Sequence, residues 1–188
     1  NGGGMTCFNN SSPSLVNVTI SNNLLGGGIY CSWHSSPSLV NVTISNNDGT
    51  GISLSQSSPS LVNVTISKNG TGMSCVGASA TPSLVNVTIS NNVDGGIYCG
   101  AYGPSPTLVN TIVANNTGNY GIYVESGNPT ITYSDFYNNE NGNFYGCEQW
   151  VGVNVTTNAN GDSCDAYYNI QEDPEFVDLD NNNYHLQN

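Results

Sequence analysis

The chain has 188 residues, of which 7% are charged, and its formal net charge is −12 with Lys68 as the only basic residue. Binding to DNA, RNA or an anionic membrane surface depends on lysine and arginine, so this composition argues against those partners. No apolar run approaches the ~20 residues that a membrane-spanning helix needs, so we expect no membrane insertion.

One phrase recurs along most of the chain with a period of about 23 residues. It first reads SSPSLVNVTISNN, and its copies and decaying variants occupy residues 11–23, 35–47, 57–69, 81–92, 105–116 and 128–139. A fixed period in this range is typical of a solenoid, in which each unit buries its apolar edge against its neighbours.

Each unit contains three short β-strand patterns separated by turns. In the unit 26–47, residues 29–31 alternate as a strand does, 39–40 form a second apolar pair and 42–45 a third segment. Glycine, proline, asparagine and serine fill the gaps, and β-branched residues make helices unfavourable. The pattern predicts an all-β fold in which every repeat is one rung of a parallel β-helix.

Aligning the units gives three unbroken apolar columns, one per strand, that we expect to face the interior. They are Ile29, Ile52, Met73, Ile97, Ile122 and Phe144; Leu15, Leu39, Leu61, Leu84, Leu108 and Ile131; and Ile20, Ile44, Ile66, Ile89, Val113 and Phe136. Two further columns are Asn23, Asn47, Asn69, Asn92, Asn116 and Asn139, and Asn17, Asn41, Asn63, Asn86 and Asn110. Asparagine tolerates the left-handed backbone of tight turns, and stacked amides can form hydrogen-bonded ladders.

The phrases SPSLVNVTISNN and GGIYC and the ending DPEFVDLDNNNYHLQ resemble the right-handed parallel β-helix repeat proteins of secreted and cell-surface proteins, in the pectate-lyase-like superfamily. This resemblance implies a single right-handed parallel β-helix of about 7–8 rungs and an extracellular or cell-surface location. The repeat phrases cover residues 1–147, and 148–188 are expected to be an irregular closing segment of the same domain. The resemblance favours a structural or adhesive module that presents its surface to carbohydrate or to another surface protein.

Polysaccharide lyases and glycoside hydrolases of this superfamily suggest an alternative, catalytic role. The lyases use a basic residue and calcium-binding aspartates, and the hydrolases use clustered aspartates with a histidine; this chain lacks arginine, and its histidines lie in other contexts. Asp135 and Glu125 are the two carboxylates that we consider for a common groove, since glycoside hydrolysis requires such a pair. We assign no catalytic residue from the sequence.

A strip of tyrosines is the candidate glycan-binding site. Tyr98, Tyr123 and Tyr145 fall at the same outward position of consecutive rungs. Aromatic rings at this spacing can stack on sugar rings, or they can stack on one another and stabilise the sheet. Both interpretations stay open at this stage.

The third strand of each early unit suggests an ice-binding face as a further alternative. Its outward positions are Thr19, Ser21, Thr43, Ser45, Thr65, Ser67, Thr88 and Ser90. This regular, uncharged array resembles the Thr-x-Thr faces of β-helical antifreeze proteins, with serine in place of the second threonine.

The six cysteines fall into two groups. Cys7, Cys31, Cys75 and Cys99 share one apolar column, and we expect buried free thiols there. Cys147 and Cys164 flank the irregular segment that follows the repeats, and they are the pair that we predict to form a disulfide bond.

Two other features of the chain's ends carry alternative predictions. Asp178, Asp180 and Asn182 begin like a calcium-binding loop, although the glycine and glutamate that complete that motif are missing. Calcium is therefore the one cofactor that we consider. Open end rungs also template strand pairing, so end-to-end self-association into a filament is a further hypothesis.

Overall fold

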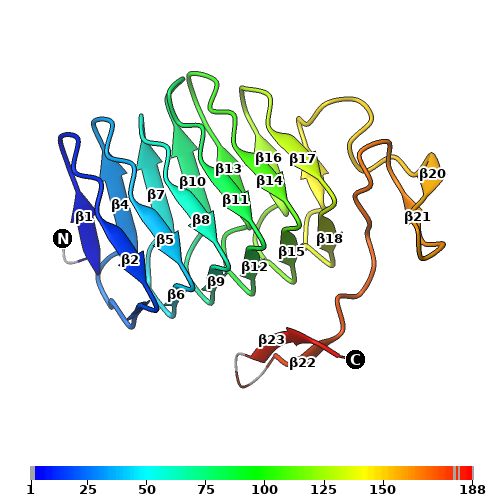
Figure 1. The fold of residues 1–188 in the computed structure, drawn as a ribbon, viewed down its shortest axis with the longest axis horizontal. Coiled ribbons are helices and arrows are strands. Elements are labelled where there is room, and N and C mark those ends of the chain that lie inside the picture. Colours follow the sequence, from blue (N-terminus) through cyan, green and yellow to red (C-terminus); the bar gives the residue numbers. More distant parts are fainter. Residues whose placement is uncertain (1–2, 180, 182, 188) are drawn as a thin grey trace.

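The three-strand unit forms six consecutive turns of a parallel coil, and a single strand begins a seventh turn (Figure 1). The fold comes from a computed structural model, which describes residues 3–179, 181 and 183–187. The expected parallel β-solenoid is confirmed, but with about six turns where 7–8 were predicted. The chain leaves the coil after β19 (Phe144–Tyr145), so its last 40 or so residues add no complete turns.

Three parallel sheets run along the coil, and the strands of each sheet come from successive turns. Sheet A consists of β1 (Met5–Cys7), β4 (Ile29–Ser32), β7 (Ile52–Ser55), β10 (Met73–Val76), β13 (Ile97–Cys99), β16 (Ile122–Val124) and β19. Sheet B consists of β2 (Ser14–Val16), β5 (Ser38–Val40), β8 (Ser60–Val62), β11 (Ser83–Val85), β14 (Thr107–Val109) and β17 (Thr130–Thr132). Sheet C consists of β3 (Thr19–Ser21), β6 (Thr43–Ser45), β9 (Thr65–Ser67), β12 (Thr88–Ser90), β15 (Ile112–Ala114) and β18 (Asp135–Tyr137).

Two antiparallel hairpins lie outside the coil. They are formed by β20 (Thr156–Thr157) with β21 (Ser163–Cys164), and by β22 (Phe176–Asp178) with β23 (Asn183–Leu186). Among the described residues, no helix is long and apolar enough to span a bilayer.

The interior is built from the predicted apolar columns, because each column is in register from one turn to the next. Met73 pairs with Ile52 and Ile97, Leu84 with Leu61 and Leu108, and their side chains have no measurable exposure. A single continuous core therefore extends along the coil axis, as the repeat requires.

A buried asparagine ladder runs beside this core. Asn92 Nδ2 donates to Asn116 Oδ1 at 2.9 Å and to the carbonyl of Ile66 at 3.3 Å, while Asn92 Oδ1 accepts from the backbone N–H of Asn69 at 3.0 Å and from its side-chain amide at 3.2 Å. The same contacts recur from Asn23 to Asn139. Each amide satisfies backbone groups that the turn would otherwise leave unpaired inside the protein.

The second asparagine column lies on the surface and supplies the left-handed turn residues. Asn41, Asn63 and Asn86 each have a φ of 54°, and the side-chain amide of each donates to the preceding asparagine of the column at 3.2 Å. The buried ladder does not itself adopt positive φ; its preceding neighbours, such as Asn46 and Asn91, do so. Both predicted ladders are thus present, and the left-handed backbone falls in the surface column and not in the buried one.

The two ends of the coil differ. At the C-terminal end, the loop that follows β19 lies over the core, and Val151 is only 9% exposed. At the other end, β1, β2 and β3 each have a neighbouring strand on one side only, and Met5 and Leu15 are half-buried. The end-to-end association hypothesis therefore loses one of its two open surfaces, because the C-terminal end is covered.

Candidate ligand-binding groove

The chain returns to the coil at residue 170, after the loop that carries β20 and β21. The backbone N–H of Ile170 donates to the carbonyl of Ser134 at 2.9 Å, and the N–H of Phe136 donates to the carbonyl of Ile170 at 3.1 Å. Ile170 also forms a parallel bridge with Asp135. The returning segment therefore extends sheet C beyond β18 and protects its edge.

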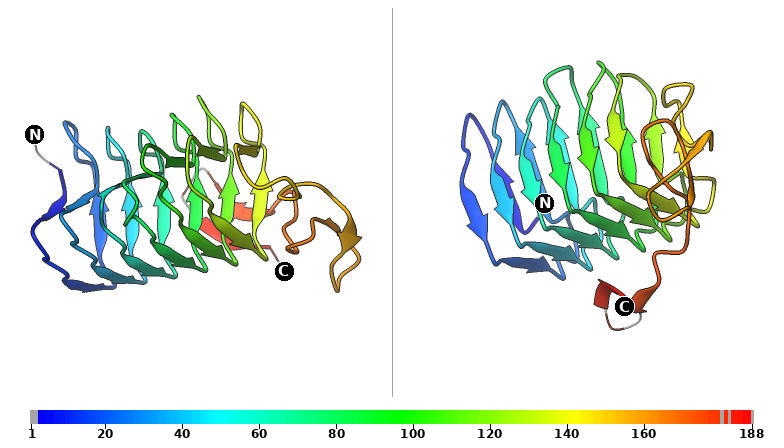
Figure 2. Two further views of the ribbon diagram at one scale, coloured as in Figure 1. Left: turned by 90° about the horizontal axis from the view of Figure 1, so that it is seen from above. Right: turned by 45° about the vertical axis from the view of Figure 1, so that its right-hand side comes forward.

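The β22–β23 hairpin then lies against the outer face of sheet C, below the coil in Figure 1 and in the right-hand view of Figure 2. Asn91 Nδ2 donates to the hydroxyl of Tyr184 in this hairpin at 3.4 Å. Tyr184 lines a cavity together with Thr43, Thr65 and Thr88 of sheet C. The hairpin thus covers part of the face that the third strands present.

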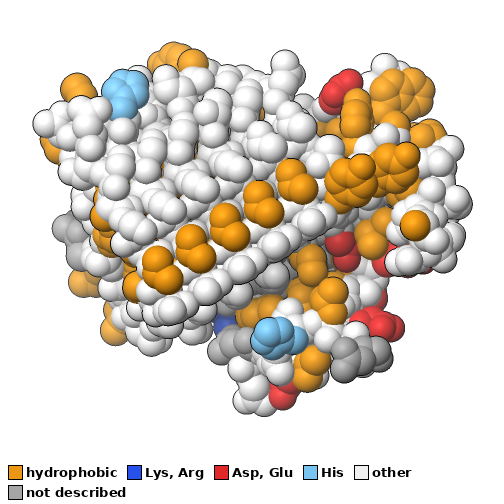
Figure 3. All heavy atoms as spheres, viewed as in Figure 1, with side chains coloured by type: hydrophobic (Ala, Val, Ile, Leu, Met, Phe, Trp, Pro, Cys, Tyr) orange, Lys and Arg blue, Asp and Glu red, His pale blue; other side chains and the backbone are white. Residues whose placement is uncertain are grey.

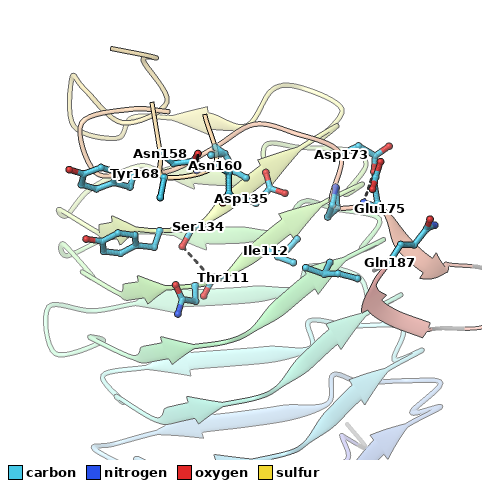
Figure 4. A pocket seen from close by; sticks show the side chains of 16 residues that line it. Thr111, Ile112, Ser134, Asp135, Asn158, Asn160, Tyr168, Asp173, Glu175 and Gln187 are labelled. Carbon is cyan, nitrogen blue, oxygen red and sulfur yellow. Dashed lines mark hydrogen bonds between the residues drawn. The ribbon is translucent and has the colours of Figure 1, made fainter. Parts of the chain in front are cut away.

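A groove with a volume of about 810 Å³ lies between the last turns of the coil and this returning segment (Figure 4). We call it the C-terminal groove. It is lined by Asn110, Thr111, Ile112, Tyr133, Ser134, Asp135, Asn158, Ala159, Asn160, Tyr168, Ile170, Asp173, Pro174, Glu175, Leu186 and Gln187. Its size lies within the range of about 300–1,000 Å³ that small-molecule sites occupy.

Tyr133 and Tyr168 both line the groove and form what we call its aromatic platform. Tyr168 lies at one end of the groove in Figure 4. The two ring centroids are 5.4 Å apart and the ring planes differ by 1°. The side chains are 59% and 46% exposed. Both residues have positive φ, 51° and 64°, and Tyr133 follows Asn110 in the exposed asparagine column. Left-handed backbone is unfavourable for tyrosine, and such strain is concentrated at functional sites.

Asp165 fixes the turn that presents Tyr168. Its carboxylate is fully buried and accepts hydrogen bonds from the backbone N–H groups of Tyr167 at 2.8 Å, Asn169 at 2.9 Å and Gly152 at 2.8 Å. Asn169 Nδ2 also donates to it, at 3.0 Å. A carboxylate with four donors holds the loop in one conformation, so the aromatic platform is preorganised.

Asp135 lies in the middle of the groove, between the platform and Asp173 in Figure 4. Its side chain is only 8% exposed, and its Oδ1 accepts from the backbone N–H of Glu172 at 3.2 Å. Burial raises the pKa of this carboxyl to about 7, and the nearby charges of Glu172 and Asp173 act in the same direction. The groove therefore holds a carboxyl that titrates near neutral pH.

The remaining polar groups of the groove are carboxylates, neutral amides and the hydroxyls of Thr111 and Ser134. Asp173 and Glu175 lie near Gln187, at the end of the groove opposite Tyr168 (Figure 4). The amides of Asn158 and Asn160 lie between these two ends. None of the lining residues is lysine, arginine or histidine. In Figure 3 the acidic side chains of the visible face gather at the C-terminal end of the molecule. The groove is thus anionic and rich in hydrogen-bonding groups.

The tyrosines that the sequence pointed to lie elsewhere, on sheet A. Tyr98 pairs with Tyr123 and Tyr123 with Tyr145 in register, as expected. Tyr123 and Tyr145 stack with centroids 4.6 Å apart, and Tyr120 packs against both at 5.9 and 5.1 Å. Tyr98 donates to Glu125, and this hydrogen bond is the main cause that raises the pKa of the Tyr98 hydroxyl. Much of the surface of these rings is therefore in contact with the neighbouring tyrosine rings.

The predicted ice-binding face is not an exposed array. Its threonines are half-buried at Thr43, Thr65 and Thr88, but Ser67 is 1% and Ser90 0% exposed. The serine in each Thr-x-Ser pair adjoins the left-handed turn, and the β22–β23 hairpin packs beside the middle of the array. Ice binding by this face stays a prediction, and part of the array lies beside the chain's own C-terminal hairpin.

The predicted Cys147–Cys164 disulfide bond is absent, because all six cysteines are free thiols. Cys147 packs against the core and lies close enough to Cys99 to affect its pKa, whereas Cys164 is held in β21 opposite Thr156. Cys7, Cys31, Cys75 and Cys99 are buried, as the apolar column predicted.

The carboxylate predictions have mixed outcomes. Glu125 faces Tyr98 and does not line the groove that contains Asp135, so these two carboxylates do not share a site. Of the calcium-loop residues, Asp180 and Asn182 lie outside the described part of the chain. Asp178 accepts from the backbone and side chain of Asn181, at 3.2 and 2.8 Å. No cluster of three or more metal-binding acids, histidines or cysteines occurs among the described residues.

The sequence reasoning missed Tyr133 and Tyr168, although one signal was available for the first of them. The exposed column keeps asparagine through five turns and then carries Tyr133. Such a change at a left-handed position indicates a role other than turn formation. No comparable signal exists for Tyr168, because the intervening loop removes it from the repeat register.

Comparison with known proteins agrees with this architecture. A family described as the right-handed β-helix region matches residues 3–161 of the chain. No curated protein and no solved structure matches it.

Proposed function

The chain belongs to the right-handed β-helix family, and we propose that it is a non-catalytic, extracellular carbohydrate-binding module of this family. The C-terminal groove carries this proposal. It combines an exposed, stacked tyrosine pair with several side-chain amides and carboxylates in a cavity of suitable size. Carbohydrate sites need these two elements, an aromatic surface for the sugar face and polar groups for the hydroxyls.

The coil supports this role as a rigid scaffold. Its strands are in register over the full length, and ladders of asparagine link successive turns. Sites built on such elements keep their geometry better than sites on isolated loops. A surface of hydroxyl and amide groups with only 7% charged residues suits an exported or surface-exposed protein.

A glycan array of the 188-residue chain, with and without calcium, tests the proposal. We expect specific retention that Tyr168→Ala weakens by about tenfold, because a ring that stacks on a ligand contributes ~1 kcal/mol or more. Tyr145→Ala probes the tyrosine strip of sheet A in the same assay. Tyr102→Ala is the matched control, since Tyr102 is 79% exposed and lines none of the cavities described above.

The outcomes separate the two candidate glycan sites. Loss with Tyr168→Ala alone assigns binding to the C-terminal groove, whereas loss with Tyr145→Ala alone moves the site to sheet A. Wild-type protein that retains no glycan would contradict carbohydrate binding and would favour a spacer or a protein-binding role. Binding that requires calcium would direct attention to Asp178, Asp180 and Asn182.

Glycoside hydrolysis is a second candidate, favoured by the environment of Asp135. A buried carboxyl with a pKa raised to about 7 suits a general acid, and Asp173 lies in the same groove as a second carboxylate. Release of reducing ends from a bound oligosaccharide, abolished by Asp135→Asn, would establish this activity. Unchanged oligosaccharide after prolonged incubation would support the non-catalytic role.

A further inference from the structure

The negative charge of the C-terminal groove disfavours anionic ligands. Within the described part of the chain, three carboxyl groups line it, those of Asp135, Asp173 and Glu175, and no basic side chain does so. A uronate, sulfate or phosphate group would meet only like charges and would lose its hydration without compensation. Anionic polysaccharides are therefore poor ligands for this groove.

Asp135 presents an acidic acceptor within the groove. Its Oδ1 accepts the backbone N–H of Glu172, and none of the described residues that line the groove offers it a basic side chain. The side chain is more than nine-tenths buried and lines the cavity. A positively charged donor from a ligand would pair with this carboxylate and offset the repulsion by Glu172 and Asp173.

A metal ion does not fit these residues. Calcium takes six to eight oxygen ligands at about 2.3–2.6 Å, and no cluster of three or more metal-binding acids, histidines or cysteines exists in the described part of the chain. The cavity of about 810 Å³ has room for an organic cation with several rings. Tyr133 and Tyr168 also offer ring faces, which attract both sugar faces and ammonium groups.

On the premise that the groove binds carbohydrate, we propose that its ligand is an amine-bearing saccharide, such as an oligomer of unacetylated glucosamine. A ring of the saccharide packs on the Tyr133–Tyr168 platform. An ammonium group on the same or the next ring pairs with Asp135 and Asp173. The amides of Asn158 and Asn160 bind hydroxyl groups between them.

Titration calorimetry with three tetrasaccharides tests this inference: glucosamine, N-acetylglucosamine and galacturonate tetramers. At neutral pH and low salt we expect the glucosamine tetramer to bind about tenfold or more tightly than the acetylated one, and the galacturonate tetramer to bind least. Added salt is expected to reduce this preference, because it screens the charge pair.

Three variants connect the preference to the groove. Asp135→Asn and Asp173→Asn are each expected to reduce the preference for the free amine while leaving acetylated-tetramer binding in place. Asp94→Asn removes the same charge from an exposed position outside the groove and is expected to change nothing. Thermal melts check that every variant is folded. Because Asp173 is exposed, Asp173→Asn is expected to fold, and it keeps the test valid if Asp135→Asn unfolds.

The failures are distinguishable. Equal or stronger binding of the acetylated or galacturonate tetramer overturns the amine inference and leaves carbohydrate binding intact. No binding of any saccharide overturns both. A tetralysine peptide that binds as tightly as the glucosamine tetramer would show recognition of ammonium groups without a saccharide, and it would also overturn the inference.

Discussion

Asp135 and Ile170 form a parallel β-bridge, although a loop with its own hairpin separates them in sequence. This contact places a carboxyl of the last complete turn beneath a returning segment that carries Glu172 and Asp173. Asp135 takes the sheet C position that Thr43, Thr65 and Thr88 hold in earlier turns, and its burial results from the returning chain. The properties of the groove therefore arise where the repeat stops.

The first prediction concerns the effect of pH on stability. Because the folded pKa of Asp135 is about 7 and its unfolded pKa is near 3.9, folding favours the protonated form, and the stabilisation is complete at low pH. It is lost as pH rises from about 4 to about 7, by roughly 2–4 kcal/mol in the free energy of unfolding. Urea unfolding at several pH values measures this loss.

Asp135→Asn isolates the contribution of this carboxyl from the general repulsion among acids. We expect the variant to lose less stability than the wild type over the same pH interval and to be the more stable protein at neutral pH. Asp94→Asn serves as the charge-matched control. A wild-type curve that rises with pH, or that has the same shape in Asp135→Asn, would contradict this account of Asp135.

The second prediction is a trade-off between stability and binding at Tyr133. Tyr133→Asn restores the residue that earlier turns have at this left-handed position, and its amide can donate to Asn110 as Asn86 donates to Asn63. The substitution relieves the backbone strain at position 133 and adds a hydrogen bond, but it removes the stacking on Tyr168. Each of these three effects is about 1 kcal/mol, so the two gains offset the loss. We expect the urea midpoint not to fall while saccharide affinity falls about tenfold. A lower midpoint with unchanged affinity would show that the tyrosine pair is structural.

Much of the fold was predictable, because each repeat has the same pattern of apolar residues and turn residues. The columns of Leu84 and Ile89 recur with apolar residues through six turns, and only a parallel coil buries all of them at once. The predicted number of turns was too high because the chain leaves the coil after β19, so that only the first strand of a seventh turn forms. The inward side of each column followed from the period of a strand.

The site was less predictable, because it depends on contacts between distant parts of the chain. Sequence reasoning identified Asp135 as an outward carboxylate but paired it with Glu125, a neighbour in sequence, and missed Asp173. The hairpin residue Tyr184 lies beside Thr65 and Thr88 of sheet C, and no repeat pattern predicts that packing. Tyr168 reaches Tyr133 only because the loop before it returns the chain to the turn.

The third prediction compares the two asparagine ladders. Asn92→Ala removes a buried amide, leaves the backbone N–H of Asn69 without its side-chain acceptor and takes one donor from the carbonyl of Ile66, so we expect a loss of about 2–4 kcal/mol in the free energy of unfolding. Asn63→Ala lies on the surface, where water replaces the amide, and is expected to cost about 1 kcal/mol from its left-handed backbone. Equal losses in denaturant melts would mean that the buried ladder is not a main source of stability.

The fourth prediction is that every cysteine is a buried or protected thiol. Burial raises the pKa of Cys99 and Cys147 to about 12, so little thiolate exists at neutral pH. Thiol reagents should react slowly with the native protein and then label six thiols per chain in denaturant without reductant. Labelling of four thiols, with a peptide map that joins Cys147 to Cys164, would restore the disulfide bond that the sequence suggested.

Because successive turns pair in the same register, the length of the coil can change without changing the residues that line the C-terminal groove. Val62 pairs with Val40 and Val85 through the same contacts that join any two turns, so one turn is interchangeable with another. Inserting a copy of the unit 35–56 would move the first strand about 4.8 Å farther from the groove without altering a residue of the groove. The number of middle turns thus sets the length of the coil in steps of one strand spacing. The distance between the first strand and the groove can therefore change without any change in the ligand that the groove binds.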